Sequence, residues 1–108
     1  IKPPIESINA SAQGAIPADT IVMLTNSSDP NAYPISGFTG VILYGEQAYN
    51  ERTKAQAEEP VNFLQWLIDQ EAQAVAQSVN YAPLPDKAIE LSKEILKSIT
   101  YEGQPVLK

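Results

Sequence analysis

The sequence of 108 residues contains no histidine and no cysteine. These two absences exclude Ser-His and Cys-His nucleophile pairs, thiolate and imidazole metal sites, iron–sulfur clusters and disulfide bonds. Basic residues are also scarce, with seven Lys and Arg against thirteen Asp and Glu and a net charge of −6. The seven cations are scattered along the chain, so no basic stripe can follow a phosphate backbone. We therefore expect no nucleic-acid partner, no metal and no cofactor.

Long apolar runs are missing as well. No stretch approaches the eighteen or so apolar residues of a membrane-spanning helix. The length and the 44% of hydrophobic positions instead fit one globular domain of common size.

The order of apolar runs, prolines and glycines predicts an α/β fold. Residues 1–15 predict a short helix, with prolines near its start and a glycine past its end. Residues 20–25 predict a strand, residues 26–34 a loop, and residues 41–44 (VILY) a second strand. Because the VILY run is apolar on both faces, we expect helices to cover it from both sides in a mixed or parallel sheet.

Two amphipathic helices are predicted in the second half of the chain. The first begins at Pro60 and runs to Val79, because its apolar residues recur every three or four positions. The second begins near Asp86 and carries Lys97 toward its negative end. Residues 101–108 predict a turn followed by a short apolar anchor. The helix stripes and the VILY strand predict a core that includes Leu64, Leu67, Ile68, Leu91 and Ile95.

Two close carboxylate pairs are candidates for acid–base chemistry. They are Glu58 with Glu59, and Asp69 with Glu71. On a helix, however, residues one or two positions apart point in different directions. We interpret both pairs as surface residues. A hydrolase that uses Glu58, Glu59 or Glu71 remains an alternative, and it would need two carboxylates that converge in a cleft.

The SGFTG segment at residues 36–40 and four aromatic residues are the other candidates. Backbone N–H groups of such a segment could bind an anion, but this one leads into a predicted strand and lacks the P-loop lysine. We interpret its glycines as a tight entry into that strand. The aromatic residues could stack on a sugar or a base, and we interpret them instead as packing residues: Tyr44, Phe63, Trp66 and Tyr81.

Two longer strings resemble a known family. They are AYPISGFTGVILYGEQ at residues 32–47 and NFLQWLIDQEAQAVAQSVNYAPLPDKAIELSKEILKSI at residues 62–99. Their order and spacing resemble the C-terminal part of the phosphate-binding proteins of ABC importers. Residues 1–29 resemble the helix and strand that precede this part in the family. The resemblance implies a periplasmic-binding-protein fold of the second type, of which this α/β chain would form the closing portion.

The resemblance also implies a division of the chain and a function. Residues 1–28 would end the second lobe, residues 29–36 would cross back, and residues 37–108 would close the first lobe. The receptor would capture inorganic phosphate and deliver it to ABC permease subunits, in a periplasmic or other extracytoplasmic location, with or without a membrane anchor. This chain would serve as scaffold and hinge, and not as an enzyme.

No phosphate ligand can be transferred to this chain from the family. Family members hold phosphate through hydroxyls, backbone N–H groups, an Arg and an Asp in earlier motifs that no segment here matches. Arg52, the only arginine, matches none of those positions. The residues near the predicted crossing would at most support the cleft or form its hinge: Tyr33, Pro34, Ser36 and Thr39.

A second function class stays open beside the receptor. The chain could be a stand-alone interaction module that keeps the scaffold of the first lobe and has no role in transport. In either case, residues 41–44 would present an apolar strand edge in the isolated chain. Because an exposed edge pairs readily with another copy, we expect a homodimer.

Overall fold

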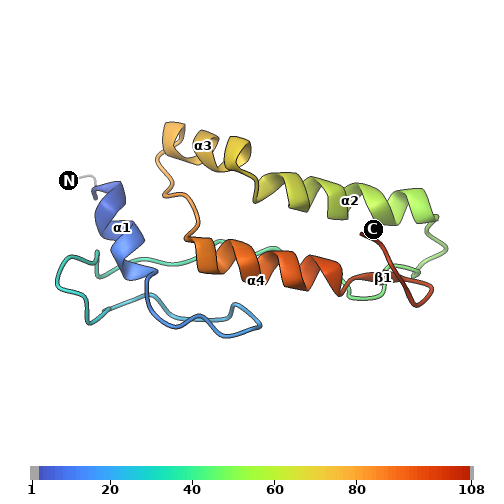
Figure 1. Cartoon of the computed structure of the whole chain (residues 1–108), viewed down its shortest axis with the longest axis horizontal. Helices are drawn as coiled ribbons and strands as arrows, with labels where there is room; N and C mark the ends of the chain where they lie inside the picture. Colours follow the sequence, from blue (N-terminus) through green and yellow to red (C-terminus); the bar gives the residue numbers. More distant parts are fainter. Residues whose placement is uncertain (1–2, 108) are drawn as a thin grey trace.

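The computed structural model describes residues 3–107, which form four α-helices and a two-stranded antiparallel sheet (Figure 1). The elements are α1 (Ile5–Ser11), α2 (Lys54–Leu67), α3 (Gln70–Ser78), α4 (Asp86–Lys97), β1 (Thr100–Tyr101) and β2 (Gln104–Pro105). The molecule is elongated, 49 × 27 × 22 Å, with α1 at one end and the β1–β2 hairpin at the other. This small mixed domain of helices and a short sheet is compatible with the predicted α/β class.

The hydrophobic core lies between α2, α4 and the C-terminal tail. Figure 1 shows α2 and α4 side by side along the long axis of the molecule. Their amphipathic stripes face each other, so each helix buries one side and leaves the other to solvent. The buried cluster consists of Val61, Ile68, Leu96, Ile99 and Val106.

The predicted core is correct in part. Ile68 is buried and Leu64 packs against the cluster, but Leu91 is only half-buried. Leu67 and Ile95 are wrong as core residues, because their exposed fractions are 36% and 37%. Both lie at the borders of their helix stripes, where a small rotation of the helix moves a side chain from the core to solvent.

The predicted helix from Pro60 to Val79 is two helices in the structure, and it starts earlier. Thr53 caps α2: its hydroxyl accepts from the Gln56 N–H, and the Gln56 side chain accepts from the Thr53 N–H. This reciprocal capping box starts the helix six residues before Pro60, which therefore lies inside α2. The helix then ends at Leu67, and α3 begins at Gln70 with Asp69 at its N-cap position.

Gln73 stabilises the break between α2 and α3. Its side-chain amide donates to the Leu67 carbonyl oxygen at 2.9 Å, which satisfies an acceptor at the end of α2. Its side-chain carbonyl accepts from the Leu84 N–H at 2.7 Å. One glutamine thus links α2, α3 and the segment that leads into α4.

Other predicted elements are confirmed. A short helix, α1, occupies residues 5–11 within the predicted range, and α4 begins at Asp86 and ends at Lys97. Residues 26–34 form a loop. In the tail, Tyr101 to Gln104 turn through the positive φ angles of Glu102 (51°) and Gly103 (78°), and Val106 is buried.

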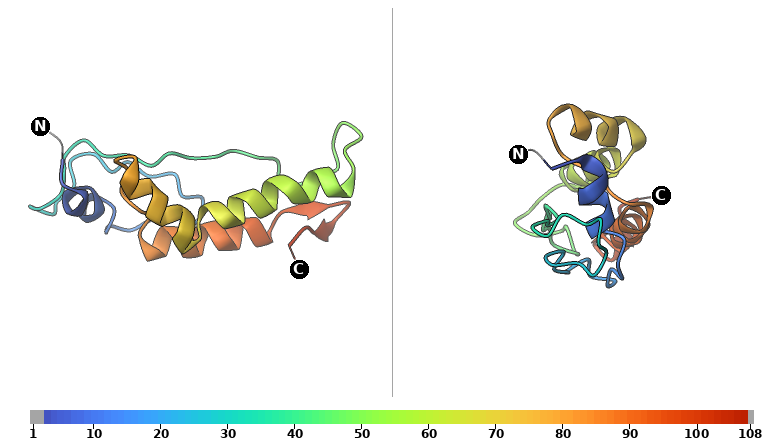
Figure 2. Two further views of the ribbon diagram at one scale, coloured as in Figure 1. Left: turned by 90° about the horizontal axis from the view of Figure 1, so that it is seen from above. Right: turned by 90° about the vertical axis from the view of Figure 1, so that its left-hand side faces the viewer.

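The two predicted strands, residues 20–25 and residues 41–44, are not strands in the structure. Figure 2 shows the chain after α1 running as an extended trace along the length of the molecule, without a neighbouring strand. Of the VILY run only Leu43 packs against the core, and Ile42 is 99% exposed. A β-strand requires a hydrogen-bonded partner, and the described residues supply one only further along, where Glu46 forms a parallel bridge with Thr100.

Candidate functional site

Three of the four predicted hinge residues lie together in a polar junction at the α1 end. The Tyr33 N–H donates to the Ser7 carbonyl oxygen at 2.8 Å. The Tyr33 carbonyl oxygen accepts from the hydroxyl of buried Ser11 at 2.8 Å and from the Ser36 hydroxyl at 3.1 Å. The Pro34 carbonyl oxygen accepts from the Asn26 N–H at 2.9 Å. These bonds fasten the predicted crossing segment to α1 on one side and to the preceding loop on the other.

The hydroxyls of the junction are engaged with one another and with backbone carbonyls. The Ser11 and Ser36 oxygens lie 3.0 Å apart, and each hydroxyl has only one hydrogen to donate. Since both hydrogens have carbonyl acceptors within the chain, neither remains for an oxyanion. Thr39 is exposed and lies outside the junction. The geometry is that of a docking joint between α1 and the extended chain.

A carboxylate clamp lies at the opposite end of the molecule. The Glu46 carboxylate accepts from the Thr100 hydroxyl at 2.7 Å and from the N–H groups of Glu102 and Gly103, at 2.8 and 3.2 Å. It also accepts from the Ala48 N–H at 2.9 Å. One side chain therefore holds the turn between β1 and β2 against the chain that follows residue 45.

These hydrogen bonds favour the charged form of Glu46. The bond from the Thr100 hydroxyl contributes most, followed by the bond from the Ala48 N–H, and together they lower the pKa of Glu46 from its ordinary value of 4.5 to about 2. A carboxylate with four donors and a lowered pKa is a poor proton acceptor. Glu46 is therefore a structural anion and not a general base.

Arg52 is the centre of a third polar cluster, next to the clamp. One of its terminal nitrogens donates to the Gln47 side-chain oxygen at 2.8 Å and to the Tyr49 hydroxyl at 2.6 Å. The guanidinium carbon lies 4.8 Å from the centre of the Tyr49 ring, which adds a cation–π contact. The Gln47 side chain is 1% exposed, and its amide donates to the Tyr44 carbonyl oxygen.

The second terminal nitrogen of Arg52 explains why α2 tolerates a proline. In a regular helix the Gln56 carbonyl would accept from the N–H of residue 60, and Pro60 has no N–H. The Arg52 guanidinium donates to that same Gln56 carbonyl. The only arginine of the chain therefore satisfies a backbone acceptor. Its terminal nitrogens are engaged by Gln47, Tyr49 and Gln56 and thereby support the fold.

Sequence reasoning missed the clamp, the arginine cluster and Gln73. Residues 46–57 carry no apolar period, and none of them is among the candidate site residues predicted from sequence. One local signal was available, namely Thr53 followed three positions later by Gln56, which is the pattern of a capping box. Three of the four donors to Glu46 lie more than fifty positions away in the sequence, and no local pattern predicts them.

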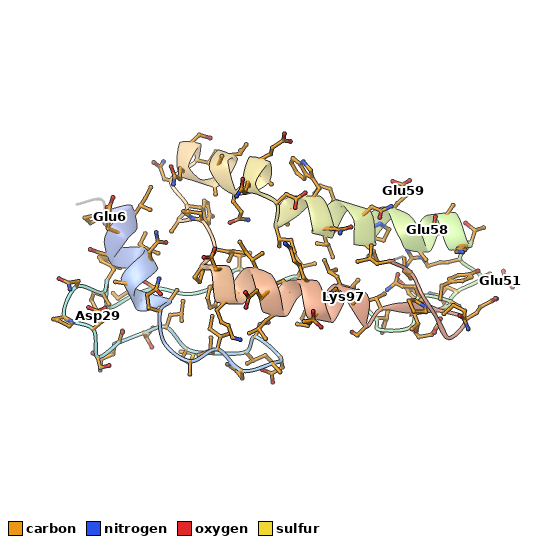
Figure 3. The ribbon with its side chains drawn as sticks, in the orientation of Figure 1. Glu6, Asp29, Glu51, Glu58, Glu59 and Lys97 are labelled. Carbon is orange, nitrogen blue, oxygen red and sulfur yellow. The ribbon has the colours of Figure 1, made fainter. Side chains whose placement is uncertain are left out.

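The Glu58–Glu59 pair lies apart from the other carboxylates that Figure 3 labels. Figure 3 shows Glu58 and Glu59 on α2, far from Glu6 and Asp29 at the α1 end and apart from Glu51 at the hairpin end. Glu58 lies 3.9 Å from the Lys54 amine on the same helix. Within residues 3–107, no group of three or more Asp or Glu side chains gathers in a way that could hold a metal ion.

The aromatic candidates are exposed, so their interpretation as core residues is wrong for this chain. Phe63 and Trp66 lie on the outer side of α2 with ring centres 6.0 Å apart, and Tyr81 is exposed beyond α3. Tyr44 contacts the Tyr49 ring edge-on at 4.7 Å and is otherwise open to solvent. Their apolar surface is available to another polypeptide or another part of one.

A shallow hollow lies between the C-terminal end of α1 and the start of α4. It has a volume of about 340 Å³ and is bordered by Asn9, Gln13, Asp86 and Lys87. The opposite charges of Asp86 and Lys87 at its rim favour neither an anion nor a cation. None of the helices formed by residues 3–107 has the length and hydrophobicity to cross a membrane.

Comparison with known proteins identified no relative of this chain. No family model, no curated protein and no solved structure matches the chain. Function must therefore be argued from the junction, the exposed apolar chain and the strings that resemble a family.

Proposed function

We propose that this chain is the C-terminal part of the substrate-binding component of a phosphate ABC importer, in which it serves as scaffold and hinge. The two long strings that resemble this family motivate the proposal. The observation that carries it is the polar junction, where Tyr33 and Ser36 tie the predicted crossing segment to α1 and Pro34 ties it to the preceding loop. A crossing segment of a two-lobed receptor needs such an anchor at one end, so that motion is confined to the chain beyond it.

The chemistry of the junction supports a role in positioning rather than in ligand capture. Its hydroxyl hydrogens already have carbonyl acceptors, and the only arginine is engaged by Gln47, Tyr49 and Gln56. The net charge of −6 repels an anion at long range. We therefore expect phosphate to be held by residues that lie outside this chain.

Two measurements test the proposal. The isolated chain, titrated calorimetrically with phosphate and with a sulfate control, should show no saturable signal tighter than about 1 mM, which corresponds to about 4 kcal/mol. The native gene product, purified from its source, should have an intact mass above 11.7 kDa and should bind phosphate. A native mass equal to that of the chain, without phosphate binding, would contradict the proposal.

The exposed outer side of α2 favours one alternative. Phe63, Trp66 and Leu67 present apolar surface on a helix whose other side is already packed. A stand-alone interaction module without a role in transport would use such a surface directly. The intact-mass measurement separates the two proposals, because the module predicts a short native protein.

A further inference from the structure

The described chain has more surface than a folded monomer of its mass. Its accessible surface is 7758 Å², whereas a monomeric protein of 11.7 kDa exposes about 5,900 Å². Its radius of gyration is 15.9 Å, against about 13 Å for a globular domain of this length. The excess of about 1,900 Å² is comparable to the surface that one subunit buries in an obligate homodimer, roughly 1,000–2,500 Å².

Much of the exposed apolar surface lies on the extended segment of residues 35–45. Ile42 and Tyr44 are exposed, while Leu43 between them packs against the core; Val41, two positions before Leu43, is exposed as well. Within residues 3–107, no backbone N–H of residues 35–45 donates to another backbone group. Residues 42–44 therefore alternate as in a half-buried strand, and the backbone N–H groups of the segment are free to join a ladder.

This segment lacks the features that protect a solvent-facing strand edge. Natural edges are blocked by lysine, other charges, proline or a bulge. Residues 35–45 (ISGFTGVILYG) contain no charged residue and no proline, although the whole chain carries twenty charged side chains. The segment is held in place at both ends, by the junction at Ser36 and by the bridge between Glu46 and Thr100. It is a pre-formed, unblocked edge.

We infer that the edge formed by residues 41–44 pairs with the same edge of a second copy of this chain. Antiparallel pairing about a twofold axis places identical segments opposite each other and gives partners to the free backbone N–H groups of both. Self-pairing brings no like charges together, because the segment is uncharged. The contact also covers Ile42, whose 99% exposure is otherwise unexplained.

Light scattering of the purified chain at micromolar concentration tests this inference. We expect a mass twice the 11.7 kDa of one chain. Ile42→Lys should reduce it to the mass of one chain, because two ammonium groups would meet at the edge. Val75→Lys is the matched control: Val75 is also exposed, lies on α3, and should leave the dimer intact. Circular dichroism verifies that both variants keep the helix content of the parent.

Cross-linking gives a second measurement that does not depend on disruptive variants. The chain has no cysteine, so Ile42→Cys and Val75→Cys each introduce one thiol per copy. A short bis-maleimide should link two copies at position 42 and not at position 75. The inference would be overturned by a monomeric parent or by a larger polydisperse assembly. It would also be overturned by a dimer that persists in Ile42→Lys and that cross-links at position 75. The result is independent of phosphate binding, so the receptor proposal and the dimer can fail separately.

Discussion

The C-terminal region, from residue 46 onward, and the N-terminal region before it differ in how far their apolar side chains are buried. In the C-terminal region, α2, α4 and the tail enclose Val61, Leu96 and Ile99, and the neighbouring polar groups have partners. In the N-terminal region, Ile21 is 80% exposed and Ile42 almost fully so, although both belong to apolar runs. The two regions have similar hydrophobic residues, and the main buried cluster of the described chain lies in the C-terminal one, although Ala12 and Leu24 are also buried.

The difference in burial follows from the apolar patterns of the two regions, which are those of amphipathic helices in one and of continuous apolar strands in the other. An amphipathic helix has one apolar side, and a single antiparallel neighbour suffices to cover it. A continuous apolar strand needs cover on two faces and a hydrogen-bonded partner on each edge. Helices α2 and α4 and a hairpin with two-residue strands cannot supply both the cover for two faces and the hydrogen-bonded partners. The apolar residues of the N-terminal region are therefore left largely exposed, and the inferred pairing of residues 41–44 would cover part of them.

The largest expected effect is on the core of the C-terminal region. Ile99→Ala should lower the free energy of unfolding by roughly 2–5 kcal/mol, because Ile99 is almost fully buried and its truncation leaves a cavity. Ile21→Ala, the same substitution in the N-terminal region, should change it by less than about 0.5 kcal/mol. Denaturant titrations measure both. Equal losses would show that the N-terminal region also has a packed core.

A smaller effect is expected where Arg52 compensates for Pro60. Arg52→Ala should cost about 1–2 kcal/mol, because the Gln56 carbonyl loses its donor. In a Pro60→Ala background the helix supplies its own N–H, and the same substitution should cost less. A double-mutant cycle of thermal or denaturant unfolding measures this coupling. Additive losses would mean that Arg52 does not act through that carbonyl.

A pH-dependent effect is expected from the Glu46 clamp. Folding lowers the pKa of Glu46 from 4.5 to about 2, so its contribution is fully present above pH 4.5 and is lost as the pH falls toward 2. Glu46→Gln should remove this part of the acid dependence of stability. Glu59→Gln, an exposed residue of α2, is the control and should leave the dependence unchanged. Parallel curves for the parent and Glu46→Gln would contradict the clamp.

The smallest expected effect is at the junction. Ser11→Ala removes one donor to the Tyr33 carbonyl and should cost about 1 kcal/mol or less. Its consequence should be local: faster hydrogen exchange at the Tyr33 N–H and unchanged protection in α4. The Ser36→Ala variant should behave in the same way, because it loses a donor to the same carbonyl. Faster exchange throughout α4 would show that the two regions unfold as one unit.

The sequence by itself determined the elements whose signals are contiguous. Apolar spacing and the change from Pro85 to Asp86 predict α4. The prolines before α1 and Gly14 after it bound that helix. The apolar end of the tail predicts an anchor, and Val106 is buried there. Local patterns are sufficient in these cases because the residues that carry them are neighbours along the chain. The residues near the crossing were selected instead from the family resemblance, and their junction with α1 joins residues more than twenty positions apart.

Only the tertiary structure decided the elements that depend on distant partners. Whether the VILY run forms a strand depends on a partner edge, which the described chain does not provide. Pro60 lies inside α2 because Arg52 reaches the carbonyl that the proline leaves free, and the Glu46 clamp depends on Thr100. Hydrogen-bond satisfaction is a property of groups that meet in space, and sequence spacing alone does not determine which groups meet.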